Sequence, residues 1–208
     1  MTTKQRKASV RATAELKQDR AVRTRAQTLH VAAQLFAQQG FRATSMQHIA
    51  DRLGMTKGAV YFHFPTKETL AVAIVEEHYG RWPKVVKEVQ AEGLSPVESA
   101  EEILKRAAVA FRDDPVMQAG ARLQLERPHI DAELPTPYVD WTQLLQSLLV
   151  TAKYSGELRE GVDPEAAART LVSSFFGVQH ISDVLSHRKD IAERWEETRK
   201  LLFYSLRA

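Results

Sequence analysis

The 208-residue sequence contains no cysteine, which excludes disulfide bonds, thiolate nucleophiles and metal sites built on cysteine. No apolar run reaches the ~18 residues of a membrane-spanning helix, so we expect no membrane partner. The Walker, GxGxxG and GxSxG motifs are also missing, and we expect no enzymatic activity, no catalytic residues and no cofactor. The basic N-terminus lacks the apolar segment of a secretory signal, which together with the missing cysteine favours a cytoplasmic protein.

No segment shows the two-residue alternation of a β-strand, whereas apolar residues recur at helical spacing throughout the chain. The sequence therefore predicts an all-α protein of about nine helices. Their expected positions are about 19–39, 45–53, 56–65, 66–90, 95–113, 115–126, 137–156, 163–186 and 189–206.

Capping residues support several of these boundaries. An apolar stripe predicts the first helix, and Gly40 is expected to stop it. Thr44, Thr56 and Thr66 are expected to be the N-caps of the next three helices. Later starts carry a serine or aspartate followed by proline, including the capping box of Ser95 and Glu98. The stripe of the first helix consists of Val22, Ala26, Leu29, Ala33 and Phe36.

Charge is divided unevenly along the chain. Residues 1–67 hold 12 Lys and Arg against three acids, a net charge of +9, whereas residues 68–208 hold 17 against 23, a net charge of −6. A basic N-terminal third predicts a polyanionic partner for that part of the chain.

Three residues in this basic region have the spacing of a helix-turn-helix. Ala50 provides a small residue where two helices cross, Gly54 tolerates a positive φ in the turn, and Val60 is an apolar residue that fixes the second helix. With the surrounding caps and charge, the pattern predicts DNA binding, with residues 57–63 as the recognition helix.

The residues expected at DNA lie on this unit. Lys57 suits guanine or a phosphate, Gly58 lets the backbone approach a base, and Tyr61 shares the face of Lys57. Because the helix has barely two turns, it needs anchors, and we expect Phe62 and Phe64 to point inward. The full set of predicted DNA-binding residues is Thr44, Ser45, Thr56, Lys57, Gly58, Tyr61, His63 and Lys67.

The stretch AAQLFAQQGFRATSMQHIADRLGMTKGAVYFHFPTKETL resembles the N-terminal domain of the TetR family of transcriptional repressors. The stretches VEEHYGRWP and DPEAAARTLVSSFFGVQHISDVL, with the segment around Trp141, resemble the family's γ-butyrolactone autoregulator receptors, and among these the receptors of furan signals.

This resemblance implies a homodimeric repressor of antibiotic or secondary-metabolite biosynthesis. Such a repressor binds a pseudo-palindromic operator in double-stranded DNA and leaves it when a small signalling ligand binds. The ligand is expected to be a γ-butyrolactone, butenolide or alkylfuran. The expected domains are a flexible basic arm (1–18), the helix-turn-helix domain (19–65) and a ligand-binding and dimerisation domain (66–208).

Candidate ligand-binding residues combine an apolar body with a polar tip on otherwise apolar helix faces. The resemblance implies that Trp141 lines the ligand cavity. The first candidates are Tyr79, Gln124, Tyr138 and Trp141, and the outer wall is expected to include Trp82, Phe111, Phe176 and Gln179.

The last two helices carry apolar stripes that suit a four-helix interface with a second copy. Trp195 is expected to pack in the core in line with Leu202 and Leu206. The stripe on the preceding helix consists of Leu171, Phe175, Val178, Ile181 and Leu185.

Several alternatives remain open. The protein could instead be a multidrug-efflux regulator or a pseudo-receptor that responds to antibiotics. A metal site of His180, Asp183 and His187 is possible but disfavoured, because such clusters are usually solvated. The arm could reach DNA through Arg11, Lys17 and Arg20, although a flexible tail is favoured.

Overall fold

The computed structural model describes the backbone of residues 3–208 and the side chains of residues 17–208. The described residues form α-helices and one short 3₁₀ helix, so the all-α prediction is confirmed. The chain divides into two units, each built from two segments. The N-terminal unit consists of the residues up to Val75 together with Ala119–Leu134, and the C-terminal unit consists of Glu76–Gln118 and Pro135–Ala208.

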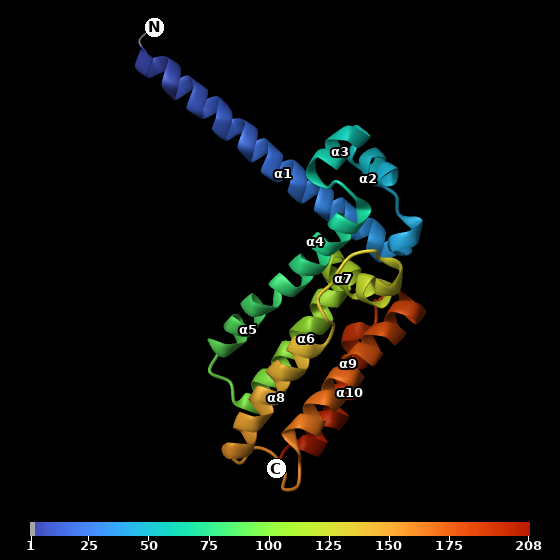
Figure 1. Ribbon diagram of the computed structural model, residues 1–208. Coiled ribbons are helices and arrows are strands. Elements are labelled where there is room, and N and C mark those ends of the chain that lie inside the picture. The colour runs from blue at the N-terminus through green and yellow to red at the C-terminus, as the bar shows by residue number, and fades with distance from the viewer. Residues whose placement is uncertain (1–2) are drawn as a thin grey trace. The chain divides into compact units, whose positions relative to one another are not determined.

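The N-terminal unit begins with α1 (Thr3–Ala43), which starts well before the expected position of about 19 (Figure 1). Its helical geometry is interrupted at Gly40, with φ 83° and ψ 176°, where the sequence predicted a stop. The predicted stripe is buried only in its second half: Leu29, Ala33 and Phe36 are buried, whereas Val22 and Ala26 are exposed.

The helix-turn-helix consists of α2 (Met46–Leu53) and α3 (Lys57–His63). Ala50 and Val60 are fully buried, and Gly54 ends α2 in the left-handed conformation that its role requires. Thr56 is the N-cap of α3, as predicted. The prediction for α2 is one residue out, because Ser45 is its N-cap and accepts a hydrogen bond from the amide of His48.

The expected helix at 66–90 is two helices, α4 (Lys67–Gly80) and α5 (Trp82–Gln90), which accounts for the tenth α-helix in the described chain. The break falls at Arg81, two residues before Pro83, which lies in the first turn of α5. Proline has no amide hydrogen and clashes with the carbonyl four residues earlier, so it kinks or breaks a helix at this position.

The rest of the C-terminal unit is a helical bundle, in which α6 (Pro96–Asp113), α8 (Val139–Tyr154), α9 (Pro164–Ser186) and α10 (Ile191–Leu206) pack together (Figure 1). The capping box of Ser95 and Glu98 starts α6, and Asp163 caps α9, as their sequences predicted. Two further elements of the described chain are α7 (Pro115–Leu125), which crosses from the C-terminal to the N-terminal unit after Gln118, and the 3₁₀ helix η1 (Arg127–His129) of the N-terminal unit. Within the described residues, no helix is long and apolar enough to cross a membrane.

Candidate DNA-binding and ligand-binding sites

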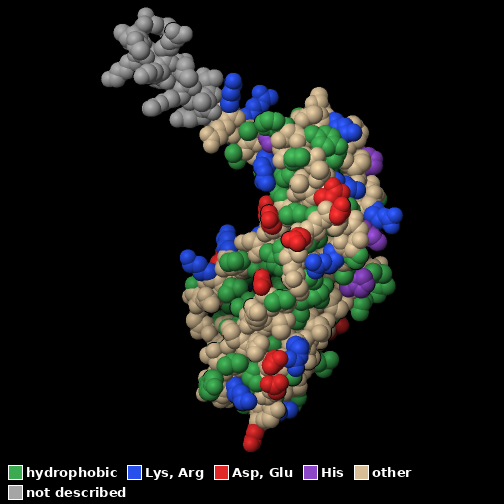
Figure 2. All heavy atoms as spheres, in the orientation of Figure 1, with side chains coloured by type: hydrophobic (Ala, Val, Ile, Leu, Met, Phe, Trp, Pro, Cys, Tyr) green, Lys and Arg blue, Asp and Glu red, His purple; other side chains and the backbone are tan. Residues whose placement is uncertain are grey.

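The exposed face of α3 carries most of the predicted DNA-binding residues. Lys57 and Gly58 are exposed, and the Lys57 amine lies 5.5 Å from the centre of the Tyr61 ring. A β-carbon added to Gly58 would meet no atom within 4 Å, so the backbone there is open to a partner. Figure 2 shows Lys and Arg side chains on the surface formed by α1 to α3, with hydrophobic side chains among them. This surface can offer cationic, hydroxyl and backbone groups to DNA.

The two phenylalanines of this segment behave differently. Phe64 is buried as predicted, and the Arg25 guanidinium lies 4.8 Å above its ring. Phe62 is 80% exposed, so the prediction that it points inward is wrong. Val60 and Phe64 are four residues apart and share one helix face, whereas Phe62 is two residues from each and faces the opposite side. Phe62 is therefore part of the exposed surface.

The Lys67 amine is engaged inside the N-terminal unit. It donates hydrogen bonds to the carbonyl oxygens of Phe41 at 2.8 Å and Thr44 at 3.0 Å, and it lies 4.1 Å from the centre of the Phe41 ring. Burial lowers the pKa of Lys67 below its ordinary value. In this structure Lys67 holds the residues after the α1 break in place, and its role as a phosphate contact stays a prediction.

A second brace acts on the same break. The Glu126 carboxylate accepts a hydrogen bond from the Phe41 amide at 2.7 Å and pairs with Arg122 at 2.9 Å. Arg122 also donates to the carbonyl of Ala37 at 3.1 Å. These contacts satisfy amide and carbonyl groups that the interruption at Gly40 leaves without helical partners. We call Arg122 and Glu126 the α7 brace.

The other predicted DNA contacts differ in exposure. Thr56 is exposed and Ser45 and His63 are half-buried. Thr44 is only 1% exposed and donates its hydroxyl hydrogen to the Gly40 carbonyl at 2.8 Å, so its side chain is unavailable to DNA. In the N-terminal arm, Lys17 and Arg20 are exposed, and Arg11 lies outside the residues whose side chains are described.

An apolar pocket of about 230 Å³ lies in the C-terminal unit and brings together three predicted ligand residues, Tyr79, Trp82 and Trp141. The two tryptophan rings meet edge to face with centroids 4.6 Å apart. Four other lining residues were not among the sequence candidates. Two of them could have been found from helical spacing, because Val86 follows Trp82 by four residues and Leu144 follows Trp141 by three. The missed residues are Pro83, Val86, Asp140 and Leu144.

Three more predicted residues form a cluster of rings beside this pocket without lining it. Phe111 is fully buried, 6.0 Å from Trp82. Phe176 lies 6.1 Å from Trp141 and 4.6 Å from Tyr138, between ring centroids. Burial raises the pKa of Tyr138, so its hydroxyl stays protonated and can donate a hydrogen bond.

The two predicted glutamines are both buried. Gln179 lies on α9 in the C-terminal unit, as the rings do, whereas Gln124 belongs to the N-terminal unit. Neither lines the apolar pocket.

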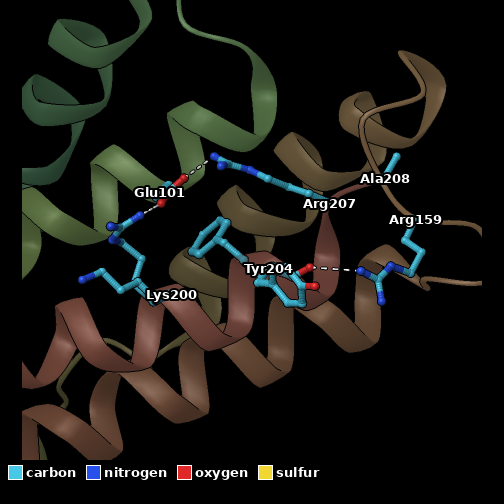
Figure 3. Close-up of a pocket in the computed structure, with 8 residues that line it drawn as sticks. Glu101, Arg159, Lys200, Tyr204, Arg207 and Ala208 are labelled. Atoms are coloured by element: carbon cyan, nitrogen blue, oxygen red, sulfur yellow. Dashed lines mark hydrogen bonds and ion pairs between the residues drawn. The ribbon is translucent and has the colours of Figure 1, made fainter.

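A larger hollow of about 570 Å³ lies near the C-terminus, and three of the charged side chains that line it are paired with one another (Figure 3). The buried Glu101 carboxylate forms ion pairs with Arg199 and Arg207. Arg159 donates to the carbonyl of Tyr204 at 3.2 Å. These bonds tie the chain end to α6 and α10, and they indicate a structural clamp.

The metal alternative gains no support. Asp183 pairs with Arg188 at 2.8 Å. Among the residues with described side chains, no group of three or more histidines and acids has the geometry to hold a metal ion.

Comparison with known proteins places this architecture in a family. The model of bacterial regulatory proteins of the tetR family matches residues 29–74, and the tetracyclin repressor-like C-terminal domain matches residues 98–206. The chain belongs to the TetR family of bacterial regulators, as its helix-turn-helix and separate helical unit also indicate.

Three relatives describe the branch more closely. The chain is 34% identical to the A-factor receptor protein of Streptomyces griseus over 86% of its length, and it spans 63% of that receptor. A solved structure on the molecular basis for control of antibiotic production by bacterial hormones is 61% identical, with a TM-score of 0.83, over 90% of this chain and 99% of the other. A γ-butyrolactone receptor (ArpA-like protein) is 30% identical, with a TM-score of 0.76 and 90% of each chain covered.

Proposed function

We propose that this protein is a dimeric transcriptional repressor that leaves its operator when a small signalling molecule binds. The ligand class is a γ-butyrolactone, butenolide or alkylfuran, and the regulated genes direct antibiotic or secondary-metabolite biosynthesis. The observation that carries the proposal is the apolar pocket of Tyr79, Trp82 and Trp141, in a chain 61% identical to a protein solved in work on hormone control of antibiotic production. Such a repressor would act in the cytoplasm and would need no catalytic activity.

The pocket supports a ligand of modest size. Its volume of about 230 Å³ falls below the ~300–1,000 Å³ of sites for drug-sized ligands. Its walls are mainly aromatic and aliphatic, and Tyr79 and Asp140 supply the polar groups of its side chains. A lactone or furan with a short alkyl chain matches this combination. The same relatives make a multidrug-efflux regulator the less favoured function.

The DNA-binding half of the proposal rests on the exposed face of α3. Two such helices in a dimer would enter major grooves one helical turn apart, ~34 Å, which requires a pseudo-palindromic operator. The exposed apolar residues of the packed helices α9 and α10 would form the dimer interface. These residues are Ile181, Val184, Leu185, Leu201 and Tyr204.

Ligand binding can release DNA only if the ligand favours a conformation that binds the operator less well. Helix α4 is the proposed connection, because the chain passes from the N-terminal to the C-terminal unit within it. Its first residue, Lys67, holds the α1 break, and Tyr79 near its end lines the pocket. Trp82, which we expected on the same helix, lies beyond the break at Arg81.

The test begins by selecting bound duplexes from a random-sequence pool and measuring their affinity in gel shifts with and without a synthetic alkyl γ-butyrolactone or alkylfuran. We expect the wild-type protein to leave its selected duplex as either ligand is added. Lys57→Ala should bind the duplex more weakly and the ligand normally. Trp141→Ala should bind the duplex normally and fail to leave it. Failure to select any duplex would refute DNA binding, and release by neither ligand class would refute the proposed signal.

A further inference from the structure

His78, in the last turn of α4, is buried beside the apolar pocket. Its side chain is 4% exposed, and its ring centroid lies 5.9 Å from that of Trp82 and 5.8 Å from that of Phe111. Burial lowers the pKa of His78 to about 4 despite a hydrogen bond to the Met117 backbone. The ring is therefore neutral at physiological pH, with one nitrogen protonated and the other bearing a lone pair.

The hydrogen bond to Met117 determines which nitrogen is which. A backbone carbonyl accepts hydrogen bonds, so the nitrogen bonded to Met117 carries the proton. The Nδ1 atom is buried and has no hydrogen-bond partner among the described residues, which identifies it as the acceptor. Buried polar groups without partners destabilise a fold and are uncommon in native proteins.

Trp82 presents the complementary group. Its Nε1–H is also buried and without a partner within the described chain, and it can only donate. The side chain is 8% exposed and lines the pocket. A donor and an acceptor therefore lie on neighbouring rings, of which Trp82 lines the pocket and His78 lies behind it. The ring centroids are 5.9 Å apart, and a shift of the rings on ligand binding would let one oxygen about 2.9 Å from each nitrogen bridge them.

We propose that His78 and Trp82 together recognise a hydroxyl group of the signalling ligand. The hydroxyl donates its hydrogen to Nδ1 of His78, and its oxygen accepts from Nε1–H of Trp82. A ketone, ether or lactone oxygen has no hydrogen to donate, and an ionised carboxylate has none either. The pocket thus selects a lactone or furan that carries an alcohol. This inference rests on the proposed function and specifies which members of the ligand class are effective.

Two synthetic probes test the inference: an alkyl γ-butyrolactone with a hydroxyl on its side chain, and the same molecule with a ketone in its place. Their dissociation constants are measured by calorimetry with the full-length protein. The wild type should prefer the alcohol about tenfold, which corresponds to a single discriminating hydrogen bond of about 1.4 kcal/mol.

Variants separate recognition from packing. Trp82→Phe keeps an aromatic ring but removes a donor from which both the alcohol and the ketone oxygen can accept, so it should weaken binding of both probes and leave most of the preference. His78→Phe removes the acceptor that only the alcohol can use and should reduce the preference to about one, whereas His78→Asn, which keeps an acceptor, should retain part of it. The matched control is Trp195→Phe: its Nε1 is also buried without a partner, but the ring packs on Phe175 at 5.0 Å and does not line the pocket. The control should keep the wild-type preference.

The outcomes distinguish this inference from the proposed function. Equal binding of both probes by the wild type, or an unchanged preference in His78→Phe, overturns the hydroxyl-recognition pair and leaves the ligand class standing. If the wild type binds neither probe, the proposed ligand class fails and the inference fails with it. Should His78→Phe not fold, an unchanged affinity of Trp82→Phe for both probes overturns the pair, since this change removes the indole donor and only part of one ring.

Discussion

Replacement of Gly40 by alanine should destabilise the N-terminal unit for two separable reasons. The first is the backbone, whose φ of 83° and ψ of 176° lie in a region that is essentially restricted to glycine. The second is space, because a β-carbon at Gly40 would collide with the Glu126 carboxylate. That carboxylate accepts the Phe41 amide hydrogen bond at 2.7 Å, so displacing it also loses part of the α7 brace.

The expected magnitude combines both effects. Holding a residue with a β-carbon in this conformation costs about 1–3 kcal/mol. Losing a hydrogen bond to a charged group costs about 1.5–3 kcal/mol. The Glu126 side chain is 23% exposed, so water partly replaces the lost bond. We therefore expect a decrease of about 3–4 kcal/mol in the free energy of unfolding.

Urea denaturation of Gly40→Ala, Glu126→Ala and the double variant separates the backbone strain from the collision with the Glu126 carboxylate. The steric conflict requires both the new β-carbon and the carboxylate, so the double variant should lose about 1–2 kcal/mol less than the sum of the single variants. The control is Gly58→Ala, where the added β-carbon meets open space and φ is ordinary. Gly58→Ala should be neutral or stabilising by about 0.4–1 kcal/mol. If Gly40→Ala unfolds as the control does, the account of this break is wrong.

Three further predictions concern the clamp, the pocket and the DNA-binding surface. Glu101→Gln should lower the free energy of unfolding by about 2 kcal/mol in thermal melts. This is less than the loss of a fully buried ion pair costs, because the partner Arg207 is 46% exposed. The control Glu165→Gln, in an exposed pair with Arg169, should lower it by less than ~0.5 kcal/mol. Burial lowers the pKa of His78 from 6.5 to about 4, so between these pH values the unfolded chain binds a proton at His78 that the folded chain does not. The free energy of unfolding should therefore be highest above pH 6.5 and fall by about 3 kcal/mol as the pH drops to 4. Denaturation of His78→Asn across this range should show a smaller dependence on pH. Phe62→Ala should weaken operator binding about tenfold in gel shifts through the loss of an apolar contact, ~1.4 kcal/mol, without lowering the unfolding free energy; an unchanged operator affinity would remove Phe62 from the interface.

The features that the sequence predicted well are set by neighbouring residues. A serine or aspartate followed by proline determines where α6 and α9 begin, and the left-handed residue Gly54 ends α2. The spacing of Ala50, Gly54 and Val60 is a property of one short segment, so the helix-turn-helix was visible without any long-range information. The break at Arg81 also depends on a neighbouring residue, Pro83, and could have been predicted from that proline.

Contacts between distant segments determine the surroundings of several predicted DNA-binding residues. Lys67 has the sequence context of a phosphate contact, and its amine also donates to the carbonyls of Phe41 and Thr44 beside the α1 break. Whether those carbonyls are within reach depends on how α1 and α4 pack. Thr44 and Ser45 are both good capping residues, and only the direction of the chain after Gly40 determines which one faces α2.

The pocket illustrates the same limit for ligand chemistry. Tyr79 and Trp82 were chosen for their residue types and the resemblance supplied Trp141; all three line one pocket, although the break at Arg81 places Tyr79 and Trp82 on different helices. His78 was not among the sequence candidates. Its significance depends on the hydrogen bond to Met117, which leaves Nδ1 as the acceptor, and on the unpaired donor of Trp82 nearby. The contact with Met117 has no sequence spacing that marks it, whereas His78 and Trp82 are four residues apart. If the hydroxyl preference is found, the selectivity of this pocket resides in two atoms whose pairing only the packed helices establish.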